Sequence, residues 1–480
     1  MPTTPCLLWL RQDLRLRDHP ALTAAYRRGG AVIPVFIHPA TAKGEWPRGA
    51  ADRYALHQVL QSHRDALRRR GSDLILRRGE PAEVLLQLVA ETGAGAVYWT
   101  RRYEPASVAL DDRLGRRLQD EGTEVRTFGG RLLLEPGEIT TRTGGPYQVF
   151  TPFYREALRR LRPSKPLPAP RRLRPPRRWP RSDHLEALRL EPRIDWAGGI
   201  RTSWTWGEEA AHRRLRRFIR RALADYETAR DRPDREGTSR LSPHLHHGEI
   251  SPRQVWRAVA SAQALGSTRE LDSAQGYLRQ LIWREFAYHL LVHFPHTPEK
   301  PLRPQFGRLR WRRARGALRS WQRGATGYPI VDAGMRQLWE TGWMHNRVRM
   351  IVASFLVKDL LLPWQEGARW FWDTLVDADL ANNTFGWQWV AGCGADAAPF
   401  FRIFNPVLQG RKFDPQGDYV RRFVPELADL AARWIHAPWQ APASVRDAAG
   451  VILDQTYPRP IVDHAVARKR ALEALSRVTR

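Results

Sequence analysis

Only two cysteines, Cys6 and Cys393, occur among the 480 residues, too few for a disulfide framework or a cysteine-based zinc site. This scarcity fits a reducing compartment, so we expect a cytoplasmic protein. Long apolar runs are also missing: the best candidate for a membrane span, residues 350–364, is interrupted by Lys358 and Asp359. The apolar run at residues 6–10 has no basic region before it, unlike a signal peptide. The sequence therefore predicts a soluble globular protein with no membrane partner.

Lysine is scarce too, and nearly all of the positive charge is arginine. Lys+Arg number 78 against 50 Asp+Glu, a formal net charge of +28. A GC-rich genome would explain arginine in place of lysine, but it would not explain the excess charge, which favours a polyanionic partner, above all nucleic acid. Of the 20 tryptophans, 15 follow residue 200, and tryptophan at such density packs, stacks or carries electrons.

Short apolar runs alternate with helical patterns over the first 130 residues. Repeated strand–helix–strand units with right-handed crossovers predict a doubly wound, parallel, five-stranded sheet. The turn after the first strand, residues 11–15, lacks the G-x-G-x-x-G pattern, so a dinucleotide clamp is not expected there. The expected strands cover residues 6–10, 31–37, 73–77, 96–99 and 124–128, and the expected helices cover 19–28, 49–70, 81–92 and 105–121.

A basic, proline-rich stretch separates two regions of different pattern. Residues 155–181 hold eleven basic residues, one acid and seven prolines, a composition that resists both helix and sheet. We interpret it as a solvated linker, with contact to DNA phosphates as the alternative. After Trp204 the apolar spacing is helical: Thr205 and Glu208 form a capping-box pattern, and an apolar stripe runs from Leu215 to Tyr226. We predict an α/β domain at residues 1–135, a linker at 136–204 and an all-α domain at 205–480.

Residues 327–406 combine polar side chains with apolar sequence in an unusual way. A helix is expected around Gly342, and spacings of three and four residues place Trp343, Asn346, Arg349 and Met350 on one stripe of it. An amide, a guanidinium and an aromatic ring on one face are unusual for a plain core helix, so this stripe is a candidate functional surface.

Two further polar segments allow both a structural and a functional interpretation. Asp377 and Asp379 form a D-x-D pair, which holds a metal in a sugar-nucleotide enzyme or caps a helix; composition alone favours the cap. The loop at residues 237–243 offers hydroxyls and backbone N–H groups suited to a phosphate, although an ordinary turn has the same pattern. The histidines at 244, 246 and 247 lack a recognisable further ligand, so no metal site is expected.

Together these segments resemble the cryptochrome/photolyase family, most closely its class I enzymes that repair cyclobutane pyrimidine dimers. The resemblance implies an α/β domain joined by a long linker to an all-α C-terminal domain that binds FAD in a bent conformation. The matching segments follow the expected order through both domains: residues 8–15, 237–243, 281–286, 326–332, 342–347, 377–389, 396–399 and 404–406.

The resemblance also assigns the cofactor contacts, residue by residue. Asn383 matches the position that faces flavin N5, where asparagine favours a repair enzyme over the animal or plant photoreceptors. A buried ion pair between Arg349 and Asp377 is expected, because neither charge is stable alone in that interior. The FAD-binding set is Tyr226, Thr238, Ser239, Arg240, Leu241, Ser242, Trp343, Arg349, Asp377, Ala378, Asp379 and Asn383.

The implied activity is that of a carbon–carbon lyase acting on UV-damaged DNA: light-excited FADH⁻ lends an electron to the dimer, whose cyclobutane bonds then break. The lesion must leave the duplex stack to be reached. We expect a monomer that associates with the nucleoid when it binds DNA. The DNA and lesion contacts implied are Arg230, Gln280, Trp283, Arg284, Asn346, Arg347, Met350, Trp389 and Gln409.

Three tryptophans match the family's electron relay: Trp387 nearest the flavin, then Trp364, then Trp311 at the surface. With Asn383 they make up the predicted catalytic set. Trp321, Trp370 and Trp372 are interpreted as packing residues.

The chain departs from the family pattern at the lesion site. Gln280 stands where cyclobutane enzymes commonly have glutamate, and enzymes for (6-4) photoproducts do carry glutamine there. Those enzymes also need a histidine pair, however, and Asn346 and Met350 stand at the matching positions, so the general acid is missing. We predict cyclobutane repair, with (6-4) repair and a cryptochrome-type blue-light photoreceptor as the alternatives.

A second departure concerns the antenna chromophore. Folate-binding relatives place an Asn-Glu pair just after a Tyr-Glu like Tyr103–Glu104, where this chain has Ala106 and Ser107. A folate antenna is therefore not expected, and a deazaflavin, a flavin or an empty pocket are the alternatives.

Overall fold

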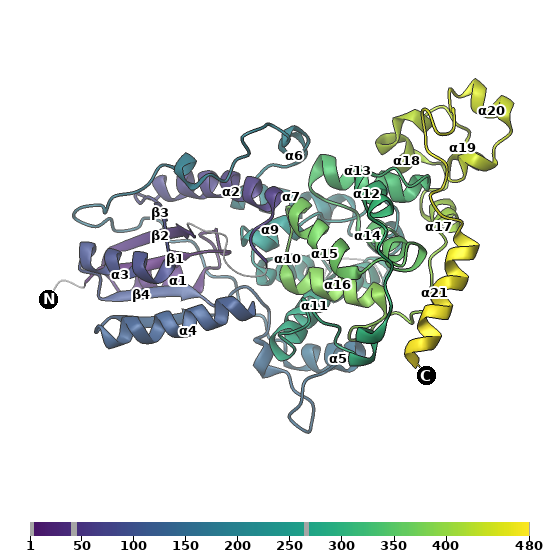
Figure 1. Cartoon of the computed structure of the whole chain (residues 1–480). Coiled ribbons are helices and arrows are strands. Elements are labelled where there is room, and N and C mark those ends of the chain that lie inside the picture. The colour runs from purple at the N-terminus through teal and green to yellow at the C-terminus, as the bar shows by residue number, and fades with distance from the viewer. Residues whose placement is uncertain (1–3, 40–45, 264–267, 480) are drawn as a thin grey trace.

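The computed structural model describes residues 4–39, 46–263 and 268–479, with an α/β domain at one end and a helical domain at the other (Figure 1). Five parallel strands form one sheet in the order β3-β2-β1-β4-β5. The chain winds outward from β1 in both directions, which confirms the predicted doubly wound sheet. The strands are β1 Cys6–Leu10, β2 Val32–His38, β3 Ile75–Arg78, β4 Ala96–Thr100 and β5 Glu124–Phe128.

Four helices cover the two faces of this sheet. On one face α1 and α2 contribute Leu22 and Leu60 to the core, and on the other α3 and α4 contribute Leu85 and Leu114. Both faces of the central strands are thus buried, as a parallel sheet requires. The helices lie within the predicted ranges: α1 Pro20–Arg27, α2 Ala50–Arg68, α3 Pro81–Thr92 and α4 Pro105–Asp120.

The connection between the domains is more ordered than its composition predicts. The expectation that residues 155–181 avoid helix is wrong at its start, because α5 (Phe150–Arg160) buries Phe153 and Ala157 and continues to residue 160. The following irregular segment packs on the α/β domain: Leu173 and Leu188 enter its core, and Leu173 N donates to Arg70 O at 2.9 Å. Short elements complete it: η1 Pro136–Glu138, η2 Leu185–Leu188 and α6 Gly198–Ser203.

The described residues beyond the connection contain helices and no strand, apart from an isolated bridge between Leu453 and Tyr457, which confirms the predicted all-α domain. The helices are α7 Glu208–Arg221, α8 Tyr226–Ala229, α9 Ser242–His247, α10 Pro252–Gln263, α11 Thr268–His293, η3 Pro304–Arg308, α12 Arg315–Arg323, α13 Pro329–Thr341, α14 Asn346–Ser354, the π-helical η4 Phe355–Asp359, α15 Trp364–Thr374, α16 Leu380–Ala391, α17 Pro406–Phe413, α18 Asp418–Phe423, η5 Pro425–Leu427, α19 Ala432–Ile435, η6 Pro438–Gln440, α20 Ala443–Ala448 and α21 His464–Thr479.

Two local predictions in this domain are wrong. Thr205 does not cap α7; the helix begins after Gly207, and the Glu208 carboxylate accepts from the backbone N–H groups of Leu16 and Arg17, at 2.8 and 2.9 Å. Gly342 does not lie inside a helix: it ends α13 in the left-handed conformation (φ 65°) that glycine adopts readily, and Trp343 lies in the turn before α14.

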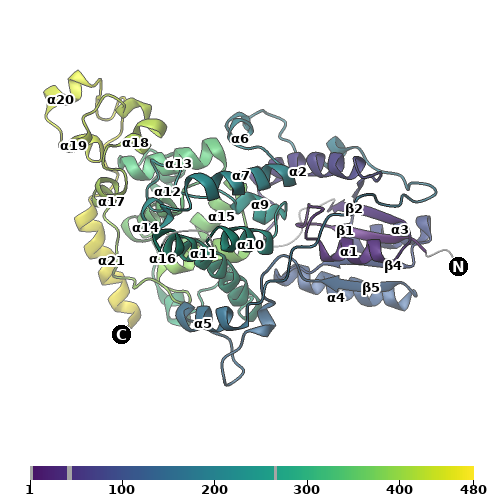
Figure 2. The same cartoon turned by 180° about the vertical axis from the view of Figure 1, so that it is seen from behind.

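The carboxyl edge of the sheet faces the helical domain, with α9 and α10 nearest to it in both views (Figure 2). The turn after β1, which lacks a dinucleotide clamp, forms part of this interface. Leu14 N donates to His247 O at 3.2 Å, and the buried Arg15 donates to Gly248 O at 3.0 Å. Searched over its described residues, the chain has no helix with the length and apolarity needed to cross a membrane.

Candidate functional site

The turn between α13 and α14 brings an ion pair and an aromatic ring together. Arg349 Nη2 lies 2.9 Å from Asp377 Oδ2 and 3.1 Å from Oδ1, which confirms the predicted pair. Asp377 is buried, whereas a quarter of the Arg349 side chain is exposed. Arg349 Nε also donates to Met344 O at 2.8 Å, and Val376 N donates to Gly342 O at 2.8 Å. These bonds fix the turn against the segment that leads into α16.

The polar loop at residues 237–243 reaches this turn from 100 residues away in the sequence. Trp343 Nε1 donates to Ser242 Oγ at 3.2 Å. The Arg240 guanidinium lies between the rings of Trp204 and Trp343, 4.8 Å from each centroid, and Arg240 has a positive φ of 50°. Burial lowers the pKa of Arg240 to about 10, and its Nε has no hydrogen-bond partner among the described residues. Arg240 as a whole is half-buried, and no hydrogen bond joins its guanidinium to another described residue, so the loop presents a cation without a protein acceptor.

Two tyrosines, Tyr226 and Tyr277, support the loop at residues 237–243. Tyr277 Oη donates to Ser239 Oγ at 3.0 Å, and the ring of Tyr226 packs edge-on against that of Tyr277 at 5.2 Å. Tyr226 and Leu241 are buried in the same hydrophobic cluster, which includes Phe218 of α7. The predicted stripe on α7 thus positions the loop, and Thr238 and Ser239 remain half-buried beside it.

Helix α16 carries the remaining predicted cofactor residues. Asp379 Oδ1 accepts from Asn382 N at 2.9 Å and from Asn382 Nδ2 at 2.7 Å, so the helix-capping interpretation of the D-x-D pair is confirmed. Asn383 Nδ2 donates to Ala368 O at 3.0 Å, which orients its amide with the carbonyl oxygen turned away from α15. Ala378, between the two aspartates, is buried.

One cluster in the described part of the chain has the donors of a metal site: Asp52, His246 and His247, all buried at the domain interface. His246 Nε2 lies 2.9 Å from Asp52 Oδ1, and Arg48 Nη1 donates to Asp52 Oδ2 at 2.6 Å. Asp52 thus supplies a further ligand that the sequence did not indicate, although Arg48 already places a positive charge beside its carboxylate.

The predicted lesion residues lie on α11, α14, α16 and α17, and Arg230 directly follows α8. Gln280 Nε2 donates to Gly276 O at 3.3 Å, one turn earlier on α11. The Trp283 ring stacks on that of Phe150 from α5, 3.4 Å between centroids and 7° between planes. Phe150 had no place in the sequence prediction, because the interdomain stretch gave no sign of a helix. Trp389 and Gln409 are half-buried on α16 and α17.

On α14, Asn346 and Met350 form a neighbouring pair, with Asn346 Nδ2 4.0 Å from the Met350 sulfur. Neither side chain is a proton donor with a pKa near neutrality. Arg347 donates to Asp231 at 2.6 Å and stacks on Phe413 at 4.4 Å, and Arg230 stacks on Tyr226 at 5.3 Å. The structure thus brings these residues to one side of the helical domain.

Arg284 follows Trp283 on α11, but its side chain is bonded toward the α/β domain. Its side chain is only 11% exposed, donates to Arg131 O at 2.8 Å and stacks on Tyr288 at 4.9 Å. The geometry therefore places Arg284 in the domain interface.

The three predicted relay tryptophans share one hydrophobic cluster. Trp387 and Trp364 are buried in it, and Trp311 packs against it half-buried. Arg312 N donates to Leu361 O at 2.9 Å, which holds the Trp311 segment beside the residues that precede Trp364. Trp321 also contacts Trp387 edge-on, with 6.2 Å between centroids.

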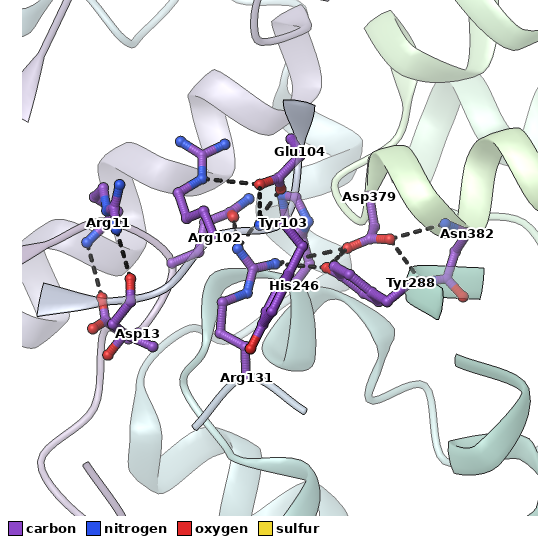
Figure 3. Close-up of polar contacts among 12 residues, drawn as sticks. Arg11, Asp13, Arg102, Tyr103, Glu104, Arg131, His246, Tyr288, Asp379 and Asn382 are labelled. Atoms are coloured by element: carbon purple, nitrogen blue, oxygen red, sulfur yellow. Dashed lines mark hydrogen bonds and ion pairs between the residues drawn. The ribbon is translucent and has the colours of Figure 1, made fainter. Parts of the chain in front are cut away.

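A polar network that the sequence did not predict joins the α/β domain to the helical domain (Figure 3). Arg131, which follows β5, donates to Tyr288 Oη at 2.7 Å, and the Tyr288 hydroxyl donates to Asp379. Arg102 Nε donates to Glu104 at 3.1 Å, and Arg131 lies 3.7 Å from the same carboxylate. The only sequence signal was a cluster of charges at the carboxyl ends of β4 and β5, where ligands and domain contacts gather in such sheets.

Comparison with known proteins gives concordant matches. A family model described as DNA photolyase matches residues 6–171, and one described as the FAD binding domain of DNA photolyase matches residues 277–477. The chain is 49% identical to a deoxyribodipyrimidine photo-lyase of Agrobacterium fabrum over 100% of this chain and 99% of that protein. It is 38% identical to Cryptochrome-1 of Arabidopsis thaliana over 98% of this chain and 70% of that protein. A crystal structure of a class III photolyase from Agrobacterium tumefaciens superposes with a TM-score of 0.96 at 49% identity, covering 100% of this chain and 98% of that one.

Proposed function

This chain belongs to the cryptochrome/photolyase family, and from that premise we propose that it is a DNA repair enzyme that splits cyclobutane pyrimidine dimers in light. The observation that carries the proposal is the convergence of three distant segments, the loop 238–242, Trp343 with Arg349, and Asp377 with Asn383, beside an α14 surface that lacks proton donors. Within the family, 49% identity to a class III enzyme favours class III over the class I subclass that the motifs suggested.

FAD fits the residues at this site. The half-buried Arg240 guanidinium, which makes no hydrogen bond to another described residue, would hold a phosphate of the cofactor, and Ser239 and Ser242 would add hydroxyl donors. Arg349, fixed by Asp377, would place its positive charge beside the flavin ring, and Asn383 would face it with its amide oxygen. When bound and reduced, FAD supplies the light-excited electron that opens the dimer.

The lesion contacts follow from α11 and α14. Pyrimidines flipped from the duplex would stack on the rings of Trp283 and Trp389. The ring of Trp283 is itself oriented by stacking on Phe150. Asn346 would donate a hydrogen bond to a base carbonyl, and Met350 would fill the apolar side of the pocket. Because (6-4) chemistry needs a proton donor at these two positions, their side chains favour the cyclobutane dimer.

Arg230 and Arg347, which Asp231 brings close together, would bind the phosphate backbone, with Gln409 completing the contact. We exclude Arg284 from this set, because its side chain is 11% exposed and its Nη1 donates to Arg131 O in the domain interface. The relay Trp387, Trp364 and Trp311 would carry electrons from the surface to an oxidised flavin, with Asn383 at its inner end.

An antenna chromophore is a separate proposal. The Tyr103–Glu104 pair, which precedes the folate signature in relatives, is used inside the protein: Tyr103 Oη donates to Glu135 at 3.0 Å and Glu104 pairs with Arg102. We infer that a folate is not held in the manner of relatives with an Asn-Glu pair. Chromophores extracted from the purified protein and identified by absorption and mass would decide between a deazaflavin, a second flavin and none.

The decisive experiment uses the purified, chemically reduced protein with synthetic oligonucleotides that carry either a cyclobutane dimer or a (6-4) photoproduct. We expect dimer splitting under blue light, none in the dark and no conversion of the (6-4) lesion, with products resolved by chromatography. FAD bound without repair of either lesion would instead support the photoreceptor, which the likeness to Cryptochrome-1 keeps as the second candidate.

A further inference from the structure

A buried arginine of the α/β domain reaches the helix that carries the candidate flavin residues. Arg131 is 3% exposed, donates to the hydroxyl of Tyr288 at 2.7 Å and lies 3.8 Å from Asp379 Oδ2. Its other Nη faces the α/β domain, where it bonds to Gln12 and lies 3.7 Å from Glu104 Oε1. Figure 3 shows this guanidinium between the carboxylates of the two domains.

Asp379 is occupied by protein donors at both carboxylate oxygens. Oδ1 accepts two hydrogen bonds from Asn382, and Oδ2 accepts from Tyr288. A carboxylate bonded in this way caps and orients α16, and it has little capacity left for a direct ligand contact. The same helix carries Asn383 and Trp387, so its starting position decides where both side chains lie.

The charges in this network depend on one another. Burial alone would raise the pKa of Asp379, but the charges of Arg284 and Arg131 and the hydrogen bond from Tyr288 oppose burial, and the pKa is lowered. Arg131 is balanced by Glu104 in its own domain and by Asp379 across the interface. A buried ion that loses its partner is strongly destabilised, so neither domain holds its charges in place alone.

We propose that Arg131 is a positioning residue for the flavin site. Acting through Tyr288, it fixes Asp379 and with it the start of α16. A residue of the α/β domain thereby determines how Asn383 and Trp387 are positioned relative to the cofactor. This inference rests on the proposed FAD site. It assigns to the α/β domain a function in cofactor binding that is independent of any antenna.

The test compares Arg131→Met, which keeps the length of the side chain but not its charge, with Arg131→Lys. FAD is titrated into the apo-protein and followed by flavin fluorescence, and the absorption bands of the bound flavin are recorded. We expect Arg131→Met to bind FAD about tenfold more weakly, with shifted flavin bands, and Arg131→Lys to recover part of both changes. Arg102→Met is the matched control, since Arg102 pairs with Glu104 but has no contact with Asp379 among the described residues.

Tyr288→Phe provides the second arm, because it removes only the hydroxyl that joins Arg131 to Asp379. If Arg131 acts through this hydroxyl, the double variant should bind FAD no more weakly than the weaker of the two single variants. Additive losses, or unchanged FAD affinity and bands in Arg131→Met, would overturn the proposal. Should Arg131→Met not fold, Tyr288→Phe alone must still weaken FAD binding. A wild-type protein that binds no FAD would instead refute the proposed function.

Discussion

Two arginines show how the domain interface differs from the flavin side, by which we mean the side of the helical domain that carries the proposed FAD site. Arg15, at the interface, donates to the carbonyl oxygens of Asp18, Gly130 and Gly248 at 2.9 to 3.2 Å. Arg240, on the flavin side, lies between two tryptophan rings and has an Nε with no acceptor among the described residues. A guanidinium held by its faces keeps its edge free for a ligand, whereas one bonded along its edge serves the fold. Substitutions at the two regions should therefore change different properties.

The largest expected effect lies on the flavin side and leaves the fold intact. Trp387→Phe should abolish photoreduction of the oxidised flavin, because phenylalanine is much harder to oxidise than tryptophan. Dimer splitting should persist when the flavin is reduced chemically beforehand. Flavin absorption during illumination measures the first effect, and Trp372→Phe, outside the proposed relay, is the control. Normal photoreduction in Trp387→Phe would remove this residue from the relay.

Substitution of Arg15 at the domain interface is expected to reduce the stability of the protein. Arg15→Met should lower the free energy of unfolding by about 4 kcal/mol, because three buried carbonyl groups lose a charged donor. Calorimetry should show the two domains unfolding in separate transitions where the native protein unfolds in one. A single transition at the native temperature would mean that Arg15 does not couple the domains.

A matching substitution at Arg240, on the flavin side, completes the comparison with Arg15. Arg240→Met should weaken FAD binding by about 2 kcal/mol, roughly thirtyfold, because the loop loses its cation. The melting temperature of the apo-protein should change little, since the methionine side chain can still pack between the rings of Trp204 and Trp343. A large loss of apo-protein stability would show that Arg240 serves the fold as Arg15 does.

The sequence predicted some regions of this molecule more accurately than others. The accuracy was high where the structure depends on local sequence patterns. The five strands and four helices of the α/β domain were predicted to within two residues at each end, because alternation and turn signals are local. The Arg349–Asp377 pair was predicted through a resemblance carried by short motifs. The stacking of Trp283 on Phe150 and the bond from Arg131 to Tyr288 were missed, since each joins segments more than 130 residues apart whose sequences carry no sign of the partner.

His345 gives the flavin side a pH dependence. Burial, together with the charges of Arg347 and Arg349, lowers its pKa to about 4, although the charges of Asp231 and Asp234 oppose this shift. Because the ordinary value is 6.5, the unfolded chain binds the proton first. The stability from neutral His345 is thus complete above pH 6.5 and is lost as pH falls toward 4, by about 3 kcal/mol.

His345→Asn tests this dependence. The histidine caps α14 by accepting from Arg347 N at 3.2 Å, and asparagine is also a good cap but does not titrate. Denaturant unfolding between pH 4 and 7 should therefore show a flatter profile in the variant. An unchanged slope would assign the pH dependence to other buried histidines, such as His63, whose pKa is lowered to about 3 by burial.

The smallest expected effect concerns Gln280, at which the two lesion hypotheses disagree. Its amide donates to Gly276 O, a bond that glutamate cannot donate when ionised, so Gln280→Glu should free the side chain to turn toward the lesion. If the site is of the cyclobutane type, the yield of dimer repair should hold or rise by about threefold, equivalent to ~0.6 kcal/mol. If the site serves (6-4) photoproducts, the native protein should repair those lesions and the substitution should impair that repair. Asn346 and Met350 favour the first outcome, since neither donates a proton near neutral pH. Illuminating the reduced native protein and Gln280→Glu with each lesion in the same oligonucleotide measures both yields, and repair confined to the (6-4) lesion would overturn the substrate while leaving the fold and the flavin site as described.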